Sequence, residues 1–129
     1  METTKSFAAF DLPVLDPITV HVQGPPHRLL GLGAYLPAGW KVDHAAPPSQ
    51  AEILVLVDPH PNEVTMTCLR HPSAAIIAVL DAYSADARAV AVLEAGADAC
   101  VRTDQAAIVA AHIEACRRRQ VASPWWTAA

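Results

Sequence analysis

The stretch AEILVLVDPHPNE, residues 51–63, decides the fold. Its run from Ile53 to Val57 is apolar at every position rather than at alternate ones, which is typical of a parallel strand buried on both faces. The run ends at a carboxylate, Asp58, and a proline-containing loop follows. A second run of this kind, AAIIAVLD at 74–81, ends at Asp81. We therefore expect two parallel strands that both end in an aspartate at the same edge of a sheet.

Strands and helices alternate along the rest of the chain. Further strands are predicted at 18–23, 40–45 and 99–103, and helices at 25–36, 62–71, 84–96 and 104–120. Two glycines in the first of these helices predict that it is short or irregular. The proline-rich linker APPSQ at 46–50 is too short for an ordinary helix. This order predicts an α/β fold: a doubly wound five-stranded parallel sheet in the flavodoxin-like order 2-1-3-4-5, with an abbreviated or missing helix between strands 2 and 3.

Helix ends and the buried side of the last helix are also predicted. Asn62, Ser84 and Asp104 are expected to cap the helices at 62–71, 84–96 and 104–120. Gly96 is expected just after the last turn of the helix that Ser84 caps. The expected buried stripe of the last helix consists of Ile108, Ala111, His112, Ala115 and Cys116.

Length and composition indicate one globular domain. The chain has 129 residues, of which 53% are hydrophobic and 17% charged. We expect an N-terminal arm at 1–16, the domain at 17–120, and a C-terminal tail or linker start at 121–129, in which Trp125 and Trp126 either fold back or contact a partner. The net charge of −4 disfavours nucleic-acid binding by this segment. The three cysteines do not have the spacing of a metal site, and we expect no metal or cofactor. The sequence shows no signal peptide or membrane-spanning segment, which predicts a cytoplasmic protein.

Several segments resemble response-regulator receiver domains in order and spacing. AEILVLVDPHP is similar to the third receiver strand, EAGADACVRT to the turn and strand near the end, and IVAAHIEACRRR to the last helix. The resemblance covers about residues 18–120 and implies that Asp58 is equivalent to the phosphate-accepting aspartate. It also implies dimerisation through the face made by the fourth helix, fifth strand and fifth helix, and a DNA-binding effector domain in a longer chain.

The other positions of the receiver phosphorylation site are changed. The acidic pair after the first strand is replaced at Gln23, Asp81 stands where the family has Ser or Thr, and Thr103 stands in place of the lysine. Arg102, next to Thr103, is expected to point to the other face of the sheet. Cys100 occupies the position of the switch aromatic, where we expect it to be a buried core residue. Phosphorylation of a carboxylate brings negative charges together, and here we expect no cation to balance them.

These departures predict a pseudo-receiver: a non-enzymatic, phosphorylation-independent regulatory domain that acts through protein contact and dimerisation. Two alternatives stay open. Asp58 and Asp81 could hold a cation for a rearranged phosphoacceptor site. Alternatively, the crevice at the strand ends, lined by Gln23, Asp58 and Asp81, could bind a small molecule.

Overall fold

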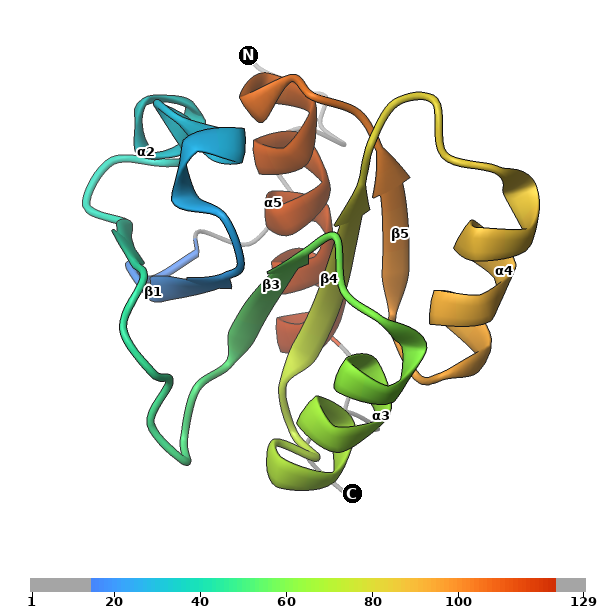
Figure 1. Cartoon of the computed structure of the whole chain (residues 1–129). Helices are drawn as coiled ribbons and strands as arrows, with labels where there is room; N and C mark the ends of the chain where they lie inside the picture. Colours follow the sequence, from blue (N-terminus) through green and yellow to red (C-terminus); the bar gives the residue numbers. More distant parts are fainter. Residues whose placement is uncertain (1–14, 123–129) are drawn as a thin grey trace, which may run out of the picture.

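The computed structural model describes residues 15–122, which form a parallel sheet with helices on both faces (Figure 1). The elements in chain order are β1 (Thr19–Gln23), the 3-10 helix η1 (Pro26–Leu29), α2 (Leu32–Tyr35), β2 (Lys41–Asp43), β3 (Ile53–Val57), α3 (Pro61–Arg70), β4 (Ala75–Leu80), α4 (Asp86–Glu94), β5 (Ala99–Arg102) and α5 (Ala106–Ala122). The predicted arm and tail, with Trp125 and Trp126, lie almost wholly outside the described residues.

The sheet confirms the predicted topology. Its strand order is β2-β1-β3-β4-β5, and every neighbouring pair is parallel. Val55 in the central strand lies opposite Val22 on one side and Ile77 on the other. Every residue of β3 and β4 is buried, as their continuously apolar sequences predict.

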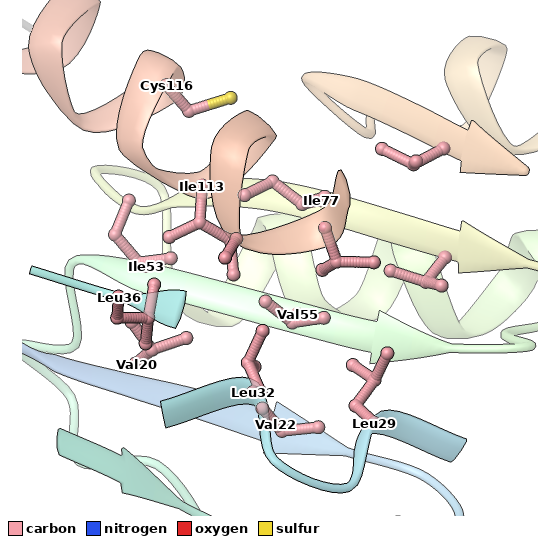
Figure 2. Packing of buried hydrophobic residues seen from close by; sticks show 14 of the residues in the cluster. Val20, Val22, Leu29, Leu32, Leu36, Ile53, Val55, Ile77, Ile113 and Cys116 are labelled. Atoms are coloured by element: carbon pink, nitrogen blue, oxygen red, sulfur yellow. The ribbon is translucent and has the colours of Figure 1, made fainter. Parts of the chain in front are cut away.

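Two separate apolar clusters form the core, one on each face of the sheet. On one face α5 packs against the central strands, and Figure 2 shows Ile113 of α5 over Ile53 and Ile77. On the other face α3 and α4 bury Val64 and Val92 against the opposite side of β3 and β4. The sheet is therefore a central layer whose strand ends are left for other contacts.

The segment after β1 is irregular, as predicted. Its two short helices, η1 and α2, are separated at Gly31, whose φ of 79° lies in the left-handed region that glycine favours. Leu29, Leu32 and Leu36 are buried against the α5 face of β1 (Figure 2). These leucines anchor a segment that has no regular helical period.

Residues 44–52, between β2 and β3, form no helix. This confirms the prediction made from the short, proline-rich linker. Because β1 lies between β2 and β3 in the sheet, this linker has to cross β1. A full crossover helix would cover one face of β1, and here the linker takes its place beside α3.

The predicted cap of α3 is wrong. The helix begins at Pro61 with His60 as its cap, one residue before the expected start. Proline is favoured in the first helical turn, where its missing N–H costs nothing. The backbone N–H of His60 donates to Oε1 of Glu63 at 3.1 Å, so a glutamate in the first turn completes this end.

The caps expected for the next two helices are also displaced. Ala85 precedes α4 in place of Ser84, and α5 begins after Gln105 rather than Asp104, with the Gln105 carbonyl accepting from Ile108. The end of α4 is as predicted, because Gly96 follows the last residues with a φ of 126°.

The buried side of α5 differs from the predicted stripe. The buried residues are Val109, Ala110, Ile113, Cys116 and Gln120, and only Cys116 was expected. Ile108 is 41% exposed. The alanine-rich sequence carries apolar residues on several sides of the helix, so its pattern does not select one face. The buried Gln120 is satisfied because its amide donates to the Glu52 carbonyl at 2.9 Å.

In residues 15–122 no helix is long and apolar enough to cross a membrane.

Candidate functional site

Asp58, at the end of the central strand, is ion-paired with Arg28. The guanidinium Nη1 of Arg28 donates to Oδ2 of Asp58. Arg28 lies in η1, next to the buried Leu29, so the short helix is held against the sheet beside the strand end. The side chains of Arg28 and Asp58 are 18% and 34% exposed, which leaves the pair partly shielded from water.

The backbone of Asp58 is unusual. Its φ of 49° makes it the one non-glycine residue with a positive φ in the described part of the chain. Aspartate tolerates this left-handed conformation better than most residues. The Asp58 N–H donates to the Val79 carbonyl at 2.8 Å, so the strand pairing with β4 holds the residue in place. Such positions are concentrated at functional sites.

The ion pair corrects one expectation from the sequence. We expected no cation near Asp58, and Arg28 supplies one. The two residues are 30 positions apart, and Arg28 lies in a segment without a regular period. The available signal was an arginine in the connection that follows the first strand, whose carboxyl end lies at the same edge of the sheet as Asp58.

The end of β1 has no room for an added side chain at Gly24. This glycine has a φ of 112°, and a Cβ built on it would lie 2.7 Å from the Val57 carbonyl oxygen. Gln23 precedes it and lines a cavity with residues of α3 and of the linker between β2 and β3. An acidic residue at Gly24 would therefore clash with the strand that carries Asp58.

Asp81, at the end of β4, is exposed. Its Oδ1 accepts from the Tyr83 N–H at 2.8 Å, which forms a local turn at the start of the loop to α4. The Arg28 contact is made by Asp58 and not by Asp81. Asp81 therefore has a structural role in its own loop.

The end of β5 separates Arg102 from Thr103. Arg102 turns toward α4, where its Nη1 donates to Oδ1 of Asp86 at 2.6 Å and to the Ser84 carbonyl at 3.1 Å. Thr103 is buried, and its Oγ1 accepts from the Gln105 N–H at 3.0 Å at the start of α5. Arg102 thus points away from Asp58, as strand alternation predicts.

Cys100 is partly buried and packs against the cluster under α3 and α4. Burial raises the pKa of the Cys100 thiol, although the Arg102 and Arg88 guanidinium groups oppose this shift. Burial also raises the pKa of Cys68 and of Cys116. Burial therefore disfavours the thiolate, the nucleophilic form, in all three side chains.

The described residues, 15–122, contain no group of three or more His, Cys, Asp or Glu side chains placed to hold a metal ion.

Of the site residues predicted from the sequence, only Asp58 contacts Arg28. The others lie in separate surroundings: Gln23, Asp81, Arg102, Thr103 and Cys100. Comparison with models of protein families and with curated proteins found no match.

Proposed function

We propose that this chain is a non-enzymatic regulatory domain, similar to a response-regulator receiver, that acts through protein contact without phosphorylation. The observation that carries the proposal is the Arg28–Asp58 ion pair. It uses a carboxylate oxygen of the residue equivalent to the phosphoacceptor. A phosphoryl donor would have to displace a charge-assisted hydrogen bond before it could react.

Charge balance supports the same conclusion. Receiver phosphorylation uses a divalent cation and a lysine to offset the carboxylate and the incoming phosphoryl group. Here Arg28 offsets the single charge of the Asp58 carboxylate, and phosphorylation would replace that charge by up to two charges on the phosphoryl group, which one guanidinium does not balance. A second candidate function follows from the same contact, because Arg28 could instead stabilise a phosphoryl group on Asp58.

Acetyl phosphate with Mg²⁺ distinguishes these two functions. We expect intact-protein mass spectrometry to show no phosphoryl adduct on the wild-type chain, because Asp58 stays paired with Arg28. The Asp58→Asn variant is the matched control, since asparagine accepts the left-handed backbone of this position. A stoichiometric adduct that is lost in Asp58→Asn and reduced in Arg28→Gln would overturn the proposal in favour of the phosphoacceptor.

The proposed partner surface is the face of α4, β5 and α5, through which two copies of the domain would associate. Val90 and Leu93 on α4 are 50% and 45% exposed, and Ile108 on α5 is 41% exposed. Exposed apolar side chains on neighbouring elements indicate a contact surface. A receiver-like domain of this kind would be joined to an effector, such as a DNA-binding domain, in a regulator of transcription or signalling in the cytoplasm.

The dimer is tested by size-exclusion chromatography with light scattering. We expect the wild-type chain to show the mass of a dimer and Leu93→Asp the mass of a monomer, because a buried carboxylate without a partner is costly at an interface. Leu69→Asp on α3, whose leucine is 71% exposed, is the control and should stay dimeric. A monomeric wild type, or dissociation by Leu69→Asp alone, contradicts the proposed surface.

A further inference from the structure

A cavity of about 240 Å³ lies between α3 and the linker that joins β2 to β3. It is lined by Gln23, Ala46, Pro47, Thr67, Arg70 and His71. Its volume falls just below the range of roughly 300–1,000 Å³ typical of small-molecule sites, so it suits a ligand smaller than a drug molecule. The linker residues 44–52 form no helix to fill this space. Asp58 and Arg28 do not line the cavity.

Two buried imidazole nitrogens in this region have no hydrogen-bond partner among residues 15–122. One is Nδ1 of His71, a residue of the cavity lining. Nδ1 of His21 is the second, and His21 is only 6% exposed. Because strand residues two positions apart share a face, His21 and Gln23 lie on the same face of β1. Buried polar atoms are nearly always paired, so the lining residue His71 lacks a polar partner that a bound molecule would supply once the ring turns toward it.

The lining carries positive charge in a chain of net charge −4. It contains the Arg70 guanidinium, the His71 imidazole and the Gln23 amide, and no carboxylate. Arg70 makes no ion pair within the part of the chain that the structure describes.

The remaining polar groups nearby are already occupied. The Thr67 hydroxyl donates to the Glu63 carbonyl at 2.7 Å, so it can only accept a further hydrogen bond. The acidic residues on adjoining segments are engaged locally: Oδ1 of Asp43 accepts from the Ala45 N–H, and Oε1 of Glu63 from the His60 N–H. Arg70, His71 and Gln23 are therefore the groups that remain for a ligand.

We propose that this cavity binds a small anionic metabolite through a carboxylate or phosphate group. Arg70 pairs with the negative charge, because a guanidinium matches both oxyanions with parallel N–H donors. His71 and Gln23 donate the flanking hydrogen bonds. As a binding site the cavity is independent of the Arg28–Asp58 pair. The idea that the bound anion is the input signal of a regulatory domain rests on the proposed function.

Isothermal titration calorimetry of the full chain tests the site with succinate and with inorganic phosphate, at matched ionic strength. Succinamide, which is uncharged, is the neutral control. We expect saturable binding of one anion per chain, no binding of succinamide, and at least a tenfold weaker affinity in Arg70→Gln. The better of the two anions identifies the oxyanion that the site prefers.

Two further variants exclude general charge effects. Arg118→Gln makes the same charge change on α5, where Arg118 pairs with Glu114, and should bind like the wild type. Ala46→Trp fills the cavity without changing charge and should abolish binding. The proposal is overturned if neither anion saturates by about 10 mM, or if Arg70→Gln and Arg118→Gln lose affinity equally. Either outcome would leave the conclusion of the acetyl phosphate experiment, and so the proposed function, unchanged.

Discussion

Ile113→Ala is expected to lower the free energy of unfolding by about 2–5 kcal/mol, the range for truncating a fully buried aliphatic residue. Ile113 has no exposed surface and lies at the centre of the contact between α5 and the sheet (Figure 2). Its truncation would leave a cavity between Ile53 and Ile77, which rigid strands cannot close. Urea denaturation followed by circular dichroism measures the loss.

Ile108→Ala is the matched control, because it removes the same atoms from the same helix. Ile108 is 41% exposed, so we expect a loss of less than about 1 kcal/mol. The pair of variants also decides which side of α5 faces the sheet. A loss for Ile108→Ala equal to that for Ile113→Ala would contradict the observed packing.

Gly24→Ala is expected to destabilise the domain by about 3 kcal/mol or more. The φ of 112° is one that alanine rarely adopts, and holding a residue in such a conformation costs about 1–3 kcal/mol. In addition, the new Cβ would lie 2.7 Å from the Val57 carbonyl oxygen, and that backbone atom cannot move without disturbing β3. Thermal and urea denaturation both measure the effect.

Gly31→Ala separates the two causes. Gly31 also has a positive φ, of 79°, but a Cβ there would meet nothing within 4 Å. We therefore expect only the conformational cost, about 1–2 kcal/mol. If the two alanine variants lose the same free energy, then the close approach of Gly24 to Val57 is not present in solution.

The fold was predictable because its strongest signals are local. The continuous apolar runs of β3 and β4 fix both strands as central, and the short linker at 46–50 leaves no room for a helix between β2 and β3. Gly96 marked the end of α4 correctly. These features depend on backbone conformation and burial within a few residues.

The errors have physical causes. Pro61 was a better signal for the start of α3 than the capping preference of Asn62, because proline fixes the first turn. The buried side of α5 could not be read from an alanine-rich helix in which Ile108, Val109 and Ile113 are all apolar. In the site, Asp58 was placed at the correct edge of the sheet. Its partner Arg28 was missed because the contact joins segments 30 residues apart.

The sheet has one unusual border, the three-residue strand β2. It bonds to β1 on one side only, and its residues Lys41 and Asp43 are exposed. A strand so short, with charged side chains at both ends, offers a poor template for a strand from another molecule. The β2 edge of the sheet is therefore closed to strand addition, and two copies of this domain do not form one continuous sheet through it.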